Sequence, residues 1–146
     1  MLKVACHCGA VRFRLAENPT WVLDCNCTIC RRYGPMWAYY HGADQAKLLD
    51  QPDLNATETY IWGDQELAFH RCRICGCMTH MATIDHDPPI TFGINMRMAV
   101  PALDPAKTLL RQIDNGHTGL FWTRSDAPML ISKQPVEPPP GPDDWR

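Results

Sequence analysis

Alternating apolar and polar residues predict short β-strands along most of the chain. In residues 10–15 three apolar side chains alternate with Arg12 and Arg14, and an apolar segment at 2–6 precedes them, so we expect an initial hairpin. Further strands are expected at 21–23, 36–41, 47–49, 57–62, 67–72, 78–83, 90–96 and 109–113. These segments are short and irregularly spaced, which indicates a mostly β domain.

Helical signals are few and short. Residues 27–34 predict one or two helical turns that end at Gly34, because glycine is favoured just after a helix and the next residue is proline. Residues 116–122 are compatible with a short helix or a loop. The proline-rich segment 135–146 predicts an extended arm without a core of its own. We therefore expect one domain over 1–134, followed by a tail over 135–146.

All eight cysteines fall in three short motifs. In chain order, the first, second and third motifs are Cys6-His7-Cys8-Gly9, Cys25-Asn26-Cys27-Thr28-Ile29-Cys30-Arg31-Arg32 and Cys72-Arg73-Ile74-Cys75-Gly76-Cys77. The residues after Met1 do not combine a basic start, a long apolar run and a small-residue cleavage site, so we expect a reducing, cytoplasmic location. In that compartment C-x-C and C-x2-C spacings favour metal ligands over disulfides.

Charge and hydropathy argue against two classes of partner. The formal net charge is −2, from 14 basic and 16 acidic residues, so there is no overall positive field to hold a phosphate backbone. The apolar runs are a few residues long, well below the roughly 20 that a membrane-spanning helix needs. We therefore expect neither a nucleic acid nor a membrane as a partner.

The spacing of the thiols indicates two zinc sites. The third motif has the Cys72-x2-Cys75-Gly76 spacing of a zinc knuckle, a tight turn that points two sulfurs at one ion. Two further ligands must come from the first motif or from the second. If the first motif supplies them, the division is Cys6, Cys8, Cys72 and Cys75 on one ion and Cys25, Cys27 and Cys30 apart from them.

A set of three thiolates with a fourth position for substrate is typical of a reactive zinc site. Such an ion would hold an incoming small thiol as its thiolate near neutral pH, which produces a positioned nucleophile. The alternative is a second structural site closed by Cys77, His80 or His7. The guanidinium groups of Arg31 and Arg32 could offset the negative charge of three thiolates.

The remaining histidines and aromatic residues have simpler interpretations. We interpret the histidines near the motifs as surface or hydrogen-bonded residues: His7, His70, His80 and His86. We interpret one aromatic group as strand packing, with the wall of a pocket as the alternative: Trp37, Tyr39 and Tyr40.

The three motifs, in this order, resemble those of the glutathione-dependent formaldehyde-activating enzymes, a family that shares a domain with the centromere protein V group. The resemblance covers about Val4 to Met98, and three ordered motifs are far more specific than one C-x2-C pair. In the second motif Asn26 stands where many members carry histidine, and Pro35 follows Gly34 where a small residue is common.

This resemblance implies a fold, two metal ions and a reaction. The fold would be a β-tent of small sheets pinned by zinc. The ligands would be Cys6, Cys8, Cys72 and Cys75 for a structural zinc and Cys25, Cys27 and Cys30 for a second zinc, with Cys77 as a further candidate. The reaction would join glutathione and formaldehyde to S-hydroxymethylglutathione, formally a carbon–sulfur lyase reaction in the synthetic direction. The alternative function is a non-catalytic two-zinc binding module or a glutathione carrier.

Overall fold

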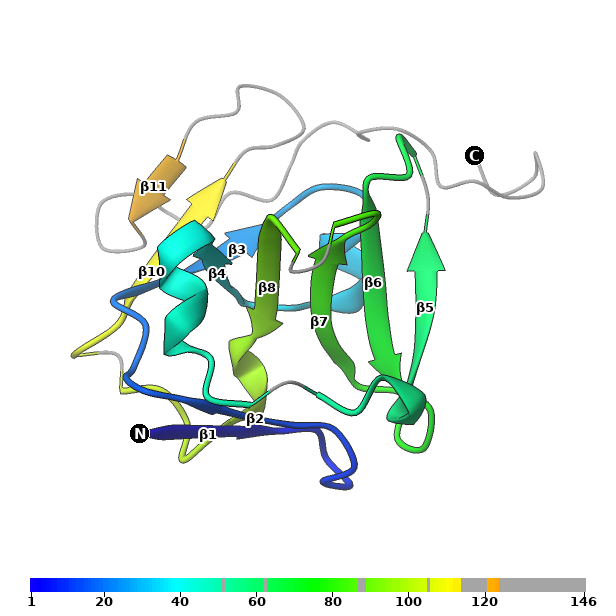
Figure 1. The fold of residues 1–146 in the computed structure, drawn as a ribbon. Helices are drawn as coiled ribbons and strands as arrows, with labels where there is room; N and C mark the ends of the chain where they lie inside the picture. The colour runs from blue at the N-terminus through cyan, green and yellow to red at the C-terminus, as the bar shows by residue number, and fades with distance from the viewer. Residues whose placement is uncertain (51, 62, 87–88, 105, 114–120, 124–146) are drawn as a thin grey trace.

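The protein is mostly β, as the alternation predicts, and its described strands form two sheets (Figure 1). The computed structural model describes residues 1–50, 52–61, 63–86, 89–104, 106–113 and 121–123. Within them the small sheet has the order β2-β1-β9, and the large sheet has the order β11-β10-β3-β4-β8-β7-β6-β5. No helix in these ranges is long and apolar enough to cross a bilayer.

The small sheet contains the hairpin predicted at the start of the chain. Strands β1 (Leu2–Ala5) and β2 (Arg12–Leu15) pair antiparallel, with Val4 opposite Phe13. The short strand β9 (Ala99–Val100) pairs with the other edge of β1. In Figure 1 this sheet runs across the lower ends of β7 and β8. The apolar residues of β1 and β2 therefore face the large sheet.

The large sheet contains most of the other predicted strands. Their bounds are β3 (Trp21–Cys25), β4 (Trp37–His41), β5 (Thr57–Ile61), β6 (Leu67–Cys72), β7 (Met78–Thr83), β8 (Thr91–Asn95), β10 (Leu109–Ile113) and β11 (Phe121–Thr123). Strands β3 and β10 pair parallel, whereas the other neighbours pair antiparallel. Strands β5 and β6 form the hairpin expected around Gly63, which has a positive φ.

The helical turns are short. Helix α1 (Cys30–Tyr33) ends at Gly34, whose φ of 69° is left-handed, and this confirms the predicted stop. Three 3₁₀ turns complete the described helical elements: η1 (Gly42–Lys47), η2 (Leu54–Ala56) and η3 (Met96–Met98).

Two predicted strands need correction. The strand expected at 47–49 is wrong, because Lys47 ends η1 and Leu48 forms only an isolated bridge with Leu15. The strand expected at 90–96 ends at Asn95, whose side chain accepts the N–H of Arg97 and so caps η3.

Two further expectations concern the end of the chain. Of the segment 116–122, the structure describes Phe121 and Trp122, which lie in β11 and not in a helix or loop. Residues 116–120 and the tail at 135–146 lie outside the described residues, so the division at 134 stays a prediction.

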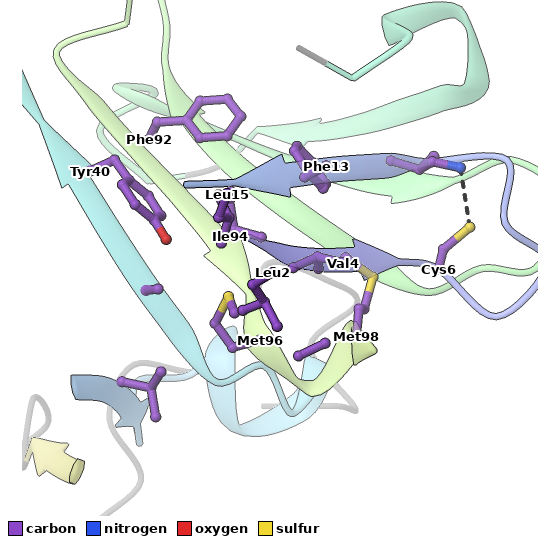
Figure 2. Packing of buried hydrophobic residues seen from close by; sticks show 14 of the residues in the cluster. Leu2, Val4, Cys6, Phe13, Leu15, Tyr40, Phe92, Ile94, Met96 and Met98 are labelled. Carbon is purple, nitrogen blue, oxygen red and sulfur yellow. Dashed lines mark hydrogen bonds between the residues drawn. The ribbon is translucent and has the colours of Figure 1, made fainter. Parts of the chain in front are cut away.

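Two hydrophobic cores cover the two faces of the large sheet. Neighbouring residues alternate between them: Trp37 and Met81 lie in one core, whereas Ala38 and Ala82 lie in the other. Figure 2 shows the first core, where Val4 of the small sheet lies near side chains of the large sheet. This core also includes Cys6 and Cys72, and the second core includes Cys25 and Cys30. The two groups of cysteines therefore lie on opposite faces of the large sheet.

Candidate metal centres

The first group of cysteines combines the first and third motifs. The sulfurs of Cys6, Cys8, Cys72 and Cys75 all lie within 4.8 Å of one another. The Sγ of Cys8 is 3.6 Å from that of Cys6 and 3.6 Å from that of Cys72. A tetrahedral zinc with bonds of about 2.3 Å separates its sulfurs by roughly 3.8 Å, whereas a disulfide bond measures about 2.05 Å. The donor set and its spacing therefore fit a divalent ion bound by four thiolates.

Two tight turns bring these four sulfurs together. In the β1–β2 turn the N–H of Gly9 donates to the carbonyl of Cys6 at 2.9 Å, and the N–H of Val11 donates to Cys6 Sγ at 3.3 Å (Figure 2). In the β6–β7 turn the N–H of Gly76 donates to the carbonyl of Cys72 at 2.9 Å. Gly9 and Gly76 have φ values of 75° and 72°, which other residues rarely adopt. The glycine of each motif therefore allows the tight turn that brings its two cysteines together.

The four cysteines of the first group range from buried to exposed. Cys6 and Cys72 are buried, Cys75 is half-buried and Cys8 is exposed. Backbone hydrogen bonding with Cys77, the largest of several causes, lowers the pKa of Cys75 to about 5. The turn therefore favours the thiolate form, which is the form that binds a metal.

Cys77, a further candidate ligand, lies beside the first group. Its sulfur interacts with the backbone of His7 and with the thiol of Cys75, and the carbonyl of Cys77 accepts the N–H of Cys72 at 2.9 Å. His80 faces the first core, where it contacts Phe13 and Phe92. Within the described ranges, neither Cys77, His7 nor His80 belongs to the second group.

The second group comes entirely from the second motif. The sulfurs of Cys25, Cys27 and Cys30 lie within 4.8 Å of one another. Cys25 ends β3 and Cys30 begins α1, and the turn between them is closed by the N–H of Arg31, which donates to the carbonyl of Cys27 at 3.1 Å. Cys25 and Cys30 are buried, whereas Cys27 is half-buried. The group therefore has one side inside the core and one side toward solvent.

The three thiols of the second group interact strongly. Hydrogen bonds from Cys25 and Cys30, helped by backbone hydrogen bonds with Cys30 and Ile29, lower the pKa of Cys27 to about 3. The hydrogen bond to Cys27 raises the pKa of Cys25 to about 11, and the hydrogen bonds with Cys25 and Cys27 raise that of Cys30 as well. Close negative charges repel one another, so a bound cation would stabilise the fully deprotonated group.

Of two aromatic residues near the second group, one has a role that the sequence did not indicate. The indole Nε1–H of the buried Trp37 donates to Cys30 Sγ at 3.2 Å. Tyr39 packs against the same core, where burial and then the negative charge of the three cysteines raise its pKa. A tryptophan seven residues after a cysteine carries no motif, so only the pairing of β3 with β4 could show this contact.

The two arginines of the second motif lie beside the group but outside the core. Arg31 and Arg32 are both exposed. The Nη1 of Arg32 donates to the carbonyl of Thr28 at 2.7 Å, which braces the turn. Their charges therefore act on the group and on approaching molecules through solvent.

These findings define the class of protein: a two-sheet β domain with two cysteine groups that could each hold a metal ion. The family profile of the glutathione-dependent formaldehyde-activating enzymes matches residues 1–101. The chain therefore belongs to this family, as the three motifs predict. It is also similar to the crystal structure of a Rhodobacter sphaeroides protein from structural genomics, with 26% identity and a TM-score of 0.55. That match covers 71% of this chain and 92% of the other.

Proposed function

We propose that the protein binds a small thiol such as glutathione at the second group and promotes its addition to an aldehyde such as formaldehyde. The product would contain a new carbon–sulfur bond. Membership of the formaldehyde-activating family and the presence of two thiol groups support this proposal. We assign the ligands as Cys6, Cys8, Cys72 and Cys75 for a structural zinc, and Cys25, Cys27 and Cys30 for a second zinc.

The composition of the second group carries the proposal. A structural zinc is held by four protein ligands, whereas a reactive zinc keeps one position for substrate. Among the described residues the first group offers four ligand atoms and the second offers three. Zinc bound to the second group would supply a Lewis acid that holds an incoming sulfur as the thiolate.

The residues around the second group suit an anionic sulfur chemistry. The N–H of Trp37 stabilises negative charge on Cys30, and backbone hydrogen bonds with Ile29 and Cys30 do the same for Cys27. The exposed guanidinium groups of Arg31 and Arg32 would attract a thiol that carries carboxylates. In the addition, an electron pair of the thiolate sulfur forms the bond to the carbonyl carbon, and the carbonyl oxygen takes a proton from water.

The test is the rate of the addition, because glutathione and formaldehyde also combine without a catalyst. NMR exchange spectroscopy with ¹³C-formaldehyde measures the interconversion of formaldehyde and S-hydroxymethylglutathione. We expect the zinc-loaded protein to accelerate this exchange and Cys27→Ser to remove the acceleration. Cys77→Ser is the matched control, since Cys77 lies outside both groups, and it should keep the activity.

The same samples separate the alternative functions. Glutathione binding that depends on Cys27, without any acceleration of the exchange, would identify a carrier. The absence of both binding and acceleration would identify a zinc-stabilised module that does not act on thiols. Either result would reject the catalytic proposal.

A further inference from the structure

Strand β5 lies at one end of the large sheet, and within the described residues no segment pairs with its outer edge (Figure 1). The other sheet ends in those ranges are covered or short. Residues 47–49 cover β2, where the N–H of Leu49 donates to the carbonyl of Arg14 at 2.8 Å. Strand β9 has two residues and β11 has three. Strand β5 has five residues, and an uncovered edge of that length is a ready template for another strand.

The outward backbone groups of β5 follow from the hydrogen bonds at its start. The N–H of Arg73 donates to the carbonyl of Ala56 at 3.0 Å, so these two residues form a hydrogen-bonded pair. The next pair is Thr57 and Cys72, and the N–H of Cys72 donates instead to the carbonyl of Cys77. Hydrogen-bonded and non-hydrogen-bonded pairs alternate along an antiparallel ladder. Residues 57, 59 and 61 therefore turn their backbone N–H and C=O groups away from β6.

Most of these outward groups have no hydrogen-bond partner in the described part of the chain. The N–H of Thr57 donates to the carbonyl of Leu54 in the preceding turn. The carbonyl of Thr57 and both backbone groups of Thr59 and Ile61 remain. Thr59 and Ile61 are exposed, so the edge is accessible to another strand.

The side chains of β5 lack the features that usually protect an edge strand. Native edges are blunted by proline, lysine or a bulge, and β5 has none of these. The charged side chain of the strand is Glu58, whose carboxylate accepts the Nε–H of Arg71 at 3.0 Å, so its charge is balanced within the chain. The other side chains are threonine, tyrosine and isoleucine, which favour strands. Tyr60 and Ile61 are 38% and 44% exposed, which leaves apolar area beside the edge.

We propose that β5 pairs antiparallel with β5 of a second copy of this chain, about a two-fold axis at Thr59. All five residues of the strand overlap in this register, and the outward groups match. The Thr59 N–H of each copy donates to the Thr59 carbonyl of the other, and the Ile61 N–H of each donates to the Thr57 carbonyl of the other. These bonds do not need the N–H of Thr57, which is already used within its own chain.

Charge and side-chain pairing favour a second copy as the partner. Glu58 lies opposite Tyr60 of the second copy, so no like charges meet along the two strands. Such a symmetric contact closes after two copies, which joins the large sheets into one continuous sheet. Five residues on each side make less than a standard interface, so the dimer should be weak and should dissociate on dilution. This dimer does not depend on the chemistry proposed for the second group.

Charge substitutions at Thr59 test both the dimer and its register, with sedimentation velocity at increasing concentration as the measurement. Because Thr59 faces its own copy across the axis, Thr59→Lys and Thr59→Glu each place like charges opposite one another and should weaken the dimer about fivefold. An equimolar mixture of the two variants should form a heterodimer that is tighter than either homodimer, which also shows that both variants fold. Thr20→Lys, the same change at another exposed threonine, is the matched control and should leave the dimer unchanged.

Thr59→Pro tests the backbone pairing. It removes an outward N–H and no bond to β6, a position at which edge strands accept proline, and should weaken the dimer about tenfold. In the wild type, NMR hydrogen exchange at the amides of Thr59 and Ile61 should slow as the concentration rises, whereas exchange at Glu58 and Tyr60 should not. A protein that stays monomeric at millimolar concentration would overturn the proposal. A dimer that resists Thr59→Lys and Thr59→Pro, a mixture that forms no tighter heterodimer, or assembly beyond two copies would also overturn it.

Discussion

The indole Nε1–H of Trp37 donates a hydrogen bond to Cys30 Sγ at 3.2 Å, and the tryptophan is completely buried. A fixed donor inside an apolar core stabilises negative charge on the sulfur, because little water is present to compete. The same sulfur lies within 4.8 Å of the sulfurs of Cys25 and Cys27. Trp37 therefore both fills the core and supports the second group through Cys30.

Replacing Trp37 with phenylalanine should weaken metal binding at the second group. The change keeps an aromatic ring and removes the N–H donor, and loss of such an outer hydrogen bond typically costs 10-fold to 100-fold in affinity. Competition titration with a chromophoric chelator should resolve two zinc-binding steps and show one step weakened by about tenfold. The step that belongs to the first group is the internal control. Two unchanged steps would contradict a role for this hydrogen bond.

The two groups should differ in what they contribute to folding. Cys8 and Cys72 are 64 residues apart, whereas the second group spans residues 25–30. A metal that closes the longer loop removes more conformational entropy from the unfolded chain. Relative to the short loop of the second group, the difference in free energy is about 2 kcal/mol, since the cost of closure grows with the logarithm of loop length. We therefore expect Cys72→Ser to lower the free energy of unfolding by about 2 kcal/mol more than Cys30→Ser does.

Urea unfolding of the zinc-loaded proteins measures this difference. Cys77→Ser controls for the loss of a thiol as such and should keep two equivalents of zinc. Equal destabilisation by Cys72→Ser and Cys30→Ser would show that the first group does not hold the two sheets together.

The stability of the protein should fall in acid through His80. This residue is fully buried, its ring lies 4.0 Å from that of His70, and burial lowers its pKa to about 2. An unfolded histidine has a pKa of about 6.5, so below that pH the unfolded state takes up a proton that the folded state refuses until about pH 2. Its contribution is therefore complete above pH 6.5 and decreases as the pH falls, by about 1.4 kcal/mol between pH 8 and pH 5.5.

His80→Phe isolates this effect. The variant keeps a ring to stack on Phe92 and loses the 3.0 Å hydrogen bond between Nδ1 and Thr79. Metal loss in acid affects both proteins alike, so the difference between their unfolding free energies should shrink by about 1.4 kcal/mol between pH 8 and pH 5.5. Parallel pH profiles would contradict the assignment.

Gly93 should not tolerate a side chain. A Cβ at this position would lie 2.9 Å from Met81 Cε and 3.0 Å from Met81 Cγ, which is close to the backbone and cannot swing away as easily as Cε. Overpacking of this kind costs about 1–3 kcal/mol. We expect Gly93→Ala to lower the free energy of unfolding by that amount, measured with urea. Gly93→Ala should cost less in a chain that already carries Met81→Ala, because that change removes the atoms that clash, so the two losses should be less than additive.

The sequence predicted those strands and helix ends that depend only on residues close together in the chain. Alternation predicted β1, β2 and most strands of the large sheet, because a strand with one buried face needs that pattern. The stop of α1 at Gly34 likewise needs only a residue that accepts a positive φ. The error at 47–49 arose because apolar residues next to a 3₁₀ turn look the same as those of a short strand.

The sequence was enough to predict the cysteines of the second group, because they are close together in the chain. It was not enough to predict the residues that surround them. Three thiols within six residues can meet through one turn, so the motif alone predicted Cys25, Cys27 and Cys30. The hydrogen bond from Trp37 depends on how β3 lies against β4, and no local signal encodes that pairing.

The sequence by itself determined the three cysteine motifs, the mostly β character and the family, because each depends only on the types of residue and their spacing along the chain. Only the tertiary structure decided that the first and third motifs share one group and that this group lies on the face of the large sheet opposite the second. It also placed Cys77 beside the first group and not the second. The physical reason is that contacts between distant segments depend on the order and register of the strands, which packing of the whole core selects.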